Sequence, residues 1–394
     1  MCKKVWIHTR CDFLINLWVK NMACRFIISS HNPYMTSLIF WGFLNLLVRS
    51  NPEIINYMNI EGYSNSYIVN INVDESKCRE VVNNINNTYT MVYNDIITKI
   101  KNGTSNAYKA WFAAYRASAR TFLIGKRPQM TNTINVGIYL SDVFNPHVCT
   151  DNLEKPHVTI SGSLGKWFWA TGHVESRTKA LESCNTCRSL AIVGLEYESI
   201  VIRSPKQGLI ATISFEGTLH EEEVFIISGL LSTSSPWIKA ISDYITPRVL
   251  DNMPINALPL IISTYLPIDL PLNINWYIIC NVIGTGRTSE YGPFKLNEYI
   301  DFTNRIKALW PHYSVLISTL IKALYGEELA TDAITLLLLL NKAAQLREPR
   351  YAYIIMREMA SFIEKAKKLE LEKYLNLGKL INLYDLAKAL HKCS

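Results

Sequence analysis

The chain has 394 residues, enough for two or three domains that each bury a core, so neither disulfides nor metals are needed for stability. Hydrophobic residues make up 49% of the chain, which excludes a disordered protein, and no apolar run is long enough to predict a membrane span. The formal net charge of +7 arises from 40 basic and 33 acidic side chains and by itself identifies no partner.

Residues 1–30 show no clear periodicity and are predicted to be an N-terminal extension. The apolar pattern then alternates between helix and strand spacing, which predicts an α/β domain over residues 31–141. The predicted elements are helices at Tyr34–Arg49 and Glu75–Ile100 and strands at Ser66–Val73 and Thr133–Leu140.

Residues 142–293 are predicted to form a β-rich central region. Its first part, up to Arg188, is rich in Pro, His, Gly and Trp and has weak periodicity, which is typical of a loop-dominated subdomain. The predicted elements that follow are strands at Leu190–Ile202, Gly208–Phe215 and Trp276–Ile283 and a helix at Glu222–Tyr244.

After Gly292 and Pro293 the pattern is helical throughout. Helices are predicted at Leu296–Tyr325, Glu327–Gln345, Arg350–Lys368 and Leu371–Lys392. Four amphipathic helices with short breaks predict a bundle over residues 294–394. The expected fold class is therefore α+β, with a mixed α/β N-terminal and central region and a C-terminal all-helical bundle.

The positive charge is concentrated in the stretch Ile96–Leu140, the basic segment. It contains no Asp or Glu, and its cations are Lys99, Lys101, Lys109, Arg116, Arg120, Lys126 and Arg127. Without these seven, the basic and acidic residues of the chain are equal in number. The positive field of the protein therefore has one local source.

Most of the basic segment has the pattern of a helix that begins after Thr104 or Ser105 and ends at Gly125. Three of its cations share one face with alanines, and aromatic residues lie opposite. Such a face can approach a phosphate backbone closely. The candidate nucleic-acid-binding residues are Lys109, Arg116, Arg120, Lys126 and Arg127. The alternative is a solvated helix face whose cations pair with carboxylates from elsewhere in the fold.

A second candidate for phosphate binding follows the predicted strand that ends at Ile283. The stretch Gly284-Thr285-Gly286-Arg287-Thr288 could hold a phosphate through backbone amides, with Arg287 assisting. It lacks the third glycine and the βαβ context of a dinucleotide site. A flexible turn is the alternative.

The cysteines carry the one metal-like signature. Cys184-Asn185-Thr186-Cys187, together with His147-Val148-Cys149, could supply the four nitrogen and sulfur ligands of a structural zinc: Cys184, Cys187, Cys149 and His147. Zinc is the one cofactor that the sequence suggests. A single Cys-x-x-Cys also describes ordinary thiols near a turn. The nine scattered cysteines otherwise argue against a disulfide framework and predict reduced thiols, most of them small core residues.

Catalytic motifs are absent from the sequence. It contains neither the Gly-x-Ser-x-Gly of a hydrolase nor the His-Glu-x-x-His of a metalloprotease. Ser161–Lys166 has its first glycine at the wrong spacing for a phosphate loop, and Trp167 stands where a hydroxyl would hold magnesium. We therefore expect a non-enzymatic protein, and the alternative is a metal-assisted hydrolase or nuclease that uses the region from His147 to Cys187.

The arrangement from about residue 31 onward resembles the large subunit of archaeal type I-A CRISPR interference (Cascade) complexes. The residues that carry the resemblance are the helix Asn32-Pro33 to Trp41-Gly42-x-Leu44-Asn45-Leu46-Leu47, then Gly62-Tyr63 and the strand Tyr67–Val73. The likeness extends loosely to the cysteine-containing central region and the C-terminal bundle. No position matches a family motif closely enough to transfer a specific role.

The resemblance implies a non-catalytic subunit of a crRNA-guided antiviral complex that helps to recognise the motif flanking the target and holds the displaced DNA. It implies crRNA and target DNA, the other subunits of the complex, and a helicase and nuclease recruited in trans as partners, with no membrane. The first thirty residues lack the pattern of a secretory signal, so we expect a cytoplasmic protein. A structural or viral protein without a nucleic-acid role is the remaining alternative.

Overall fold

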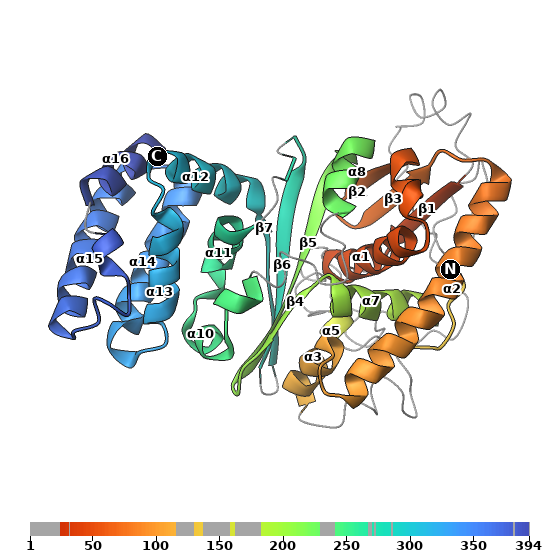
Figure 1. Cartoon of the computed structure of the whole chain (residues 1–394), viewed down its shortest axis with the longest axis horizontal. Coiled ribbons are helices and arrows are strands. Elements are labelled where there is room, and N and C mark those ends of the chain that lie inside the picture. The colour runs from red at the N-terminus through yellow and green to blue at the C-terminus, as the bar shows by residue number, and fades with distance from the viewer. Residues whose placement is uncertain are drawn as a thin grey trace, which may run out of the picture.

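The computed structural model describes residues 24–30, 32–115, 130–136, 158–161, 183–228, 241–266, 270–271, 273–284, 287–380 and 383–393. An antiparallel sheet stands in the middle of the molecule, with the N-terminal helices on one side and the C-terminal helices on the other (Figure 1). This arrangement confirms the α+β class, with its mixed N-terminal and central region and its C-terminal helices.

The strands of the described residues form one seven-stranded sheet in the order β1-β3-β2-β5-β6-β7, with β4 also paired to β5. They are β1 (Cys24–Ser29), β2 (Met58–Tyr63), β3 (Ser66–Ile71), β4 (Ile200–Arg203), β5 (Gln207–Leu219), β6 (Asn275–Gly284) and β7 (Arg287–Lys295). The long strand β5 joins the two halves, because its end pairs with β2 and its start pairs with β4. The sheet therefore continues across the boundary predicted at residue 141, and it includes residues 24–29 of the predicted extension.

The helices on the N-terminal side include the two predicted there, and both begin after a capping side chain. They are α1 (Pro33–Ser50), the 3-10 helix η3 (Pro52–Tyr57), α2 (Glu75–Lys101), α3 (Asn106–Tyr115), α5 (Val158–Ser161), α7 (Asn185–Tyr197) and α8 (Glu221–Ser228). Asn32 caps α1 by accepting the Met35 N–H at 2.7 Å, and Asp74 caps α2 by accepting the Lys77 N–H at 2.8 Å. The predicted helices at 34–49 and 75–100 are thus confirmed.

Helices α1 and α7 touch backbone to backbone. A Cβ atom on Gly42 would overlap the carbonyl oxygen of Leu190, and one on Gly194 would overlap that of Leu38. Glycine is therefore required at both positions by the close approach of the two helices. This contact fixes α7 on α1, which itself packs against β1, β3 and β5.

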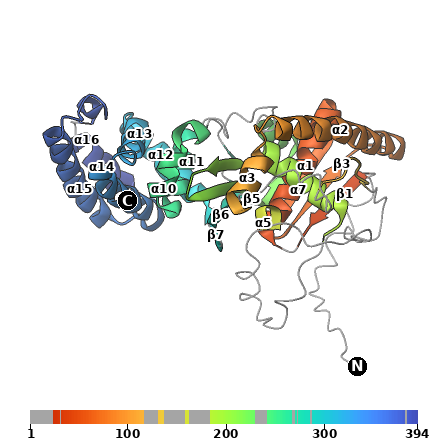
Figure 2. The same cartoon turned by 90° about the horizontal axis from the view of Figure 1, so that it is seen from below.

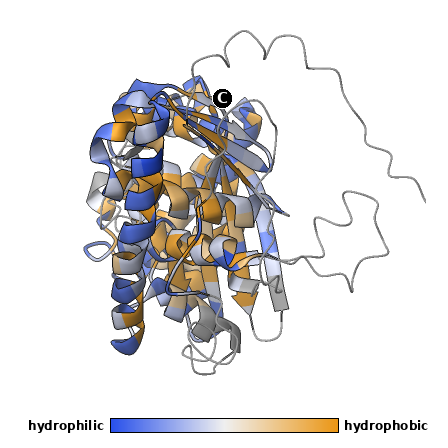
Figure 3. Cartoon of the chain, turned by 90° about the vertical axis from the view of Figure 1, so that its right-hand side faces the viewer, coloured by the Kyte–Doolittle hydropathy of each residue, from blue (hydrophilic) through white to orange (hydrophobic). Residues whose placement is uncertain are grey.

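The C-terminal helices cover the other face of β4, β5 and β6. They are α10 (Pro247–Asn252), η6 (Ile255–Ala257), α11 (Leu258–Tyr265), α12 (Leu296–Leu309), α13 (Tyr313–Ala323), α14 (Glu327–Leu346), α15 (Pro349–Lys368), η7 (Leu377–Lys379) and α16 (Leu383–Cys393). Among the described residues, α14 alone is long and apolar enough to cross a membrane. It packs against α12, α13 and α15, as the core helix of a bundle does. Figure 3 shows hydrophobic residues gathered inside the molecule and hydrophilic residues on the outer helices.

Several predicted elements are wrong in type or extent. The strand predicted at Leu190–Ile202 is helix α7 up to Tyr197 and strand β4 only from Ile200. Residues 133–136 form no strand, and the remainder of the element predicted at Thr133–Leu140 lies outside the described residues. The single helix predicted at Leu296–Tyr325 is two helices, because Trp310 is extended before Pro311. The last predicted helix begins only at Leu383.

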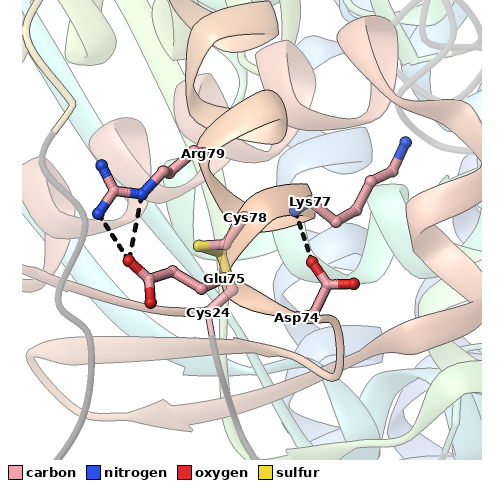
Figure 4. Close-up of a disulfide and its surroundings, with 6 residues drawn as sticks. All are labelled: Cys24, Asp74, Glu75, Lys77, Cys78 and Arg79. Carbon is pink, nitrogen blue, oxygen red and sulfur yellow. Dashed lines mark hydrogen bonds and ion pairs between the residues drawn. A yellow bond between two sulfur atoms is a disulfide. The ribbon is translucent and has the colours of Figure 1, made fainter.

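The expectation of reduced thiols is wrong for one pair. Cys24 of β1 and Cys78 of α2 form a disulfide with a sequence separation of 54, beside the capped start of α2 (Figure 4). Cys280 and Cys393 are buried thiols, as expected. The disulfide ties the edge strand of the sheet to the long helix that leads into the basic segment.

Candidate nucleic-acid interface

Helix α7 holds the start of α3, which lies within the basic segment. The carboxylate of Glu196 accepts hydrogen bonds from the Ser105 hydroxyl at 2.7 Å and from the Ala107 N–H at 3.0 Å. The side chain of Asn106 donates to the Glu196 carbonyl at 2.9 Å. Ser105 in turn caps α3 by accepting the Tyr108 N–H at 3.1 Å, which confirms it as the helix start. Glu196 thus satisfies backbone and side-chain donors at the first turn of α3.

The carboxyl groups at the end of α7 are buried. Burial raises the pKa of Glu196, although hydrogen bonds from Ala107 and Ser105 oppose the shift. Burial also raises the pKa of Glu198 well above its usual range, against a hydrogen bond from Asn45 and the positive charge of Arg49. A carboxylate in this position needs nearby cations and donors, and the neighbouring helices supply them.

One cation of the basic segment is already committed to this junction. The Lys99 ammonium lies 2.9 Å from Asp95 and 4.0 Å from Glu196. It also lies 4.3 Å from the centre of the Tyr197 ring, while the Arg49 guanidinium lies 4.2 Å from the same ring. For Lys99, therefore, the alternative of internal pairing holds. The structure gives no ion pair within the described residues for Lys101, which is exposed, or Lys109, which is half-buried.

The same helix α7 also holds the chain shortly after Arg127, the last cation of the basic segment. The Ser189 hydroxyl accepts the Thr131 N–H at 3.2 Å, and the Thr186 hydroxyl accepts the Asn135 N–H at 3.2 Å. In addition, the hydroxyl of Tyr89 donates to the Thr131 carbonyl at 2.5 Å. The chain is therefore attached to α7 at residues 105–107 and again at Thr131 and Asn135. Four of the five cations predicted to bind here, Arg116, Arg120, Lys126 and Arg127, lie outside the described residues.

Two hairpins bring further cations to one end of the sheet, which we call the cationic sheet end: Arg203, Lys206 and Arg287. Gln207, the residue after Lys206, pairs with Gly284, and Gly284 pairs with Arg287. Gln207, Gly284 and Arg287 therefore form one row across β5, β6 and β7. The outer two Cα atoms of such a row are about 10 Å apart. The side chain of Arg287 lies outside the described part of the structure, but its backbone is placed in this row.

The turn that presents Lys206 is tightly built. The Ser204 hydroxyl accepts the N–H groups of Lys206 and Gln207 at 3.1 and 2.9 Å and donates to Asp251. Helix α3 packs against β4 and β5, and Figure 1 shows it at the same lower end of the molecule as the β4–β5 turn. Figure 2 shows α3 beside β5 from below. The described part of the basic segment and the cationic sheet end therefore lie on one side of the molecule.

The predicted zinc ligands are only partly described. Cys184 and Cys187 are buried thiols in the first turn of α7, whereas His147 and Cys149 lie outside the described residues. Within the described part of the chain, no three His, Cys, Asp or Glu side chains lie close enough to hold a metal ion. A structural zinc is held by four ligands in a tetrahedron, and the two described sulfurs are only half of that set. The zinc site therefore stays a prediction.

Sequence reasoning missed Glu196 and the two cations of the β4–β5 turn. The turn had a usable signal, because Arg203-Ser204-Pro205-Lys206 separates two apolar runs and combines turn residues with basic ones. Glu196 had none, because its partners at residues 105–107 are far away in the sequence and its own segment resembled a strand.

No protein-family model matches the chain, and no curated protein matches it well enough to count as a relative. These comparisons neither support nor contradict the resemblance to the CRISPR large subunit. The charge of the basic segment, together with the geometry of its anchors on α7 and of the cationic sheet end, is therefore the basis for a functional assignment.

Proposed function

We propose that this protein is a non-catalytic nucleic-acid-binding subunit that contacts a phosphate backbone through its basic segment. The observation that carries the proposal is the absence of any acidic residue over Ile96–Leu140, where seven cations occur. Two contacts of the chain with α7, at residues 105–107 and at Thr131, support it, because they anchor the chain on both sides of the stretch that carries the predicted binding residues. Lys99 is excluded from the interface, since Asp95 and Glu196 already neutralise it.

The cationic sheet end extends the proposed interface. A nucleic-acid backbone that follows α3 reaches the β4–β5 and β6–β7 turns, where Lys206 and Arg287 add positive charge. Contacts of this kind position a nucleic acid without reading its sequence. The interface therefore favours affinity for backbone phosphates over recognition of particular bases.

The resemblance to the CRISPR large subunit gives this binding activity a context. In such a complex, crRNA pairing reads the target sequence, while protein side chains hold the backbone and recognise the flanking motif. We propose crRNA and target DNA as ligands, the other interference subunits as partners, and cleavage by a nuclease recruited in trans. Co-expression with tagged backbone subunits, followed by crRNA sequencing, tests this assignment.

The proposal places the protein in the cytoplasm of an archaeon. The Cys24–Cys78 disulfide is compatible with that location, because intracellular proteins of hyperthermophilic archaea are often rich in disulfides. Disulfides are rare in the cytosol of other organisms. In a protein from such an organism, the same bond would indicate an oxidising compartment.

The proposal is tested by fluorescence anisotropy of the protein with labelled duplex and single-stranded DNA over a salt series. A logarithmic salt slope of roughly −3 to −5 is expected for a site that neutralises about four to six phosphates. Incubation of the protein with the same DNA and metal ions, with and without a chelator, tests the alternative of a metal-assisted nuclease. DNA turnover that a chelator abolishes would assign a metal-assisted nuclease instead.

A further inference from the structure

The first turn of α7 holds two thiols in a defined arrangement. Cys184 is the N-cap residue of the helix, and its sulfur accepts the Cys187 N–H at 3.4 Å. Residues three apart in a helical turn face the same side, and a Cys-x-x-Cys pair at a helix start can close into a disulfide. Neither sulfur is in a disulfide in this structure, and both side chains are buried.

A cavity lies directly beside this pair. It is partly open, has a volume of about 50 Å³, and is lined almost entirely by apolar atoms. Residues of β1 and α1, among them Phe26, Ile39 and Phe43, form its walls, together with Val136 and Cys187. Cys187 thus borders a partly open apolar cavity, whereas Cys184 does not line it.

We propose that Cys184 and Cys187 form a redox-active dithiol that undergoes thiol–disulfide exchange with an external disulfide, such as oxidised glutathione, that reaches Cys187 from the open side of the cavity. The Cys187 sulfur attacks one sulfur of the external disulfide, which breaks, and a mixed disulfide forms as the first external thiol leaves. The Cys184 sulfur then attacks the Cys187 sulfur, closes the Cys184–Cys187 bond and releases the second external thiol. Two electrons and two protons pass from the protein dithiol to the external disulfide.

The dithiol is distinct from the other cysteines that the structure describes. Cys24 and Cys78 are already bonded to each other, and they tie β1 to α2 rather than lining the cavity. Cys280 lies in the middle of β6 and Cys393 at the end of α16, so neither is adjacent to a second thiol in sequence. These two buried thiols are internal controls for oxidation that depends on the Cys-x-x-Cys geometry.

The experiment treats the full chain with oxidised glutathione, quenches it with acid, alkylates the remaining thiols under denaturing conditions and maps the peptides by mass spectrometry. Cys184 and Cys187 are expected to lose alkylation together and to appear as one intramolecular disulfide, while Cys280 and Cys393 stay alkylated. In the Cys184→Ser variant, a glutathione mixed disulfide should accumulate at Cys187. The Cys187→Ser variant should carry several-fold less at Cys184.

Two results would overturn the proposal. One is a native chain whose Cys184 and Cys187 both stay reduced at a glutathione disulfide concentration that oxidises them in the urea-unfolded chain. The other is stoichiometric zinc in the purified protein that protects both thiols until a chelator removes it, since that outcome assigns the pair to a structural metal site.

Discussion

The carboxylate of Glu196 and the hydroxyl of Ser105 are joined by a hydrogen bond of 2.7 Å, although 91 positions separate them in the sequence. Through this bond the end of α7 caps the start of α3, and the Ala107 N–H adds a second bond to the same carboxylate oxygen. The start of α3, which lies within the basic segment, therefore depends on an acidic residue from another part of the chain.

Replacement of Glu196 by Ala is expected to destabilise the protein by about 2–3 kcal/mol, because it leaves buried donors of Ser105 and Ala107 without an acceptor. Ser105→Ala should cost about 1 kcal/mol, as for other helix caps, and the double variant should lose less than the sum. Urea unfolding measures all three. The control is Glu80→Ala, whose exposed carboxylate pairs with Lys77 on α2 and should matter little. Equal losses from Glu196→Ala and Glu80→Ala would contradict this role.

Glu198 makes the stability of the protein depend on pH in a defined direction. Its pKa is raised by burial in the folded chain, so the unfolded chain releases the proton first. The contribution of Glu198 to stability is therefore present below the ordinary glutamate pKa and is lost as the pH rises through the raised value. Glu198→Gln keeps an oxygen that can accept from Asn45 and removes the charge. Between acid and neutral pH, the variant should lose less stability than the wild type, as measured by thermal unfolding. If the variant and the wild type depend on pH in the same way, Glu198 is not the origin of the pH dependence.

The disulfide should make a large contribution to stability. For a separation of 54 residues between Cys24 and Cys78, the chain-entropy model gives about 4 kcal/mol, and measured values are commonly about 2–4 kcal/mol. The double variant Cys24→Ser, Cys78→Ser should therefore unfold at lower urea concentration by that amount. Dithiothreitol should destabilise the wild type similarly and leave the variant unaffected. A wild type insensitive to complete reduction would contradict the prediction.

The close approach of α1 and α7 predicts a severe effect of one methyl group. Gly194→Ala places a Cβ against the Leu38 carbonyl, which belongs to a helix backbone and cannot move aside cheaply. A loss of about 3 kcal/mol or more is expected in urea unfolding. Gly378→Ala is the matched control, since an added Cβ there meets no atom within 4 Å. Similar stabilities of the two variants would show that the helices are further apart.

Sequence periodicity predicted those elements that have one buried face. Helix α2 buries a stripe that includes Cys78, Ile85 and Ile96, and its predicted bounds agree with the structure almost to the residue. Helix α7 is buried on all sides from Cys187 to Tyr197, so it lacks such a stripe, and its apolar run has the pattern of a buried strand. Single-sequence patterns do not separate fully buried helices from buried strands.

The candidate interface could be predicted in part for a similar reason. Charge composition is a local property, so the acid-free basic segment is visible in the sequence alone. The anchoring by Glu196 depends on helix packing, and the row that brings Gln207, next to Lys206, into line with Arg287 depends on strand register. The pairing of Cys24 with Cys78 is equally non-local, and scattered cysteines gave no indication of it.

The most direct test of the central claim is DNA binding by the Arg116→Glu, Arg120→Glu double variant, measured by anisotropy at several salt concentrations. The control is Lys365→Glu, Lys368→Glu, which makes the same charge change on α15, where Asp332 and Glu364 already pair with the two lysines. Binding should weaken roughly 10- to 100-fold with a shallower salt slope in the first variant, and little in the control. Equal losses in both folded variants, or no loss in either, would contradict a nucleic-acid interface on the basic segment.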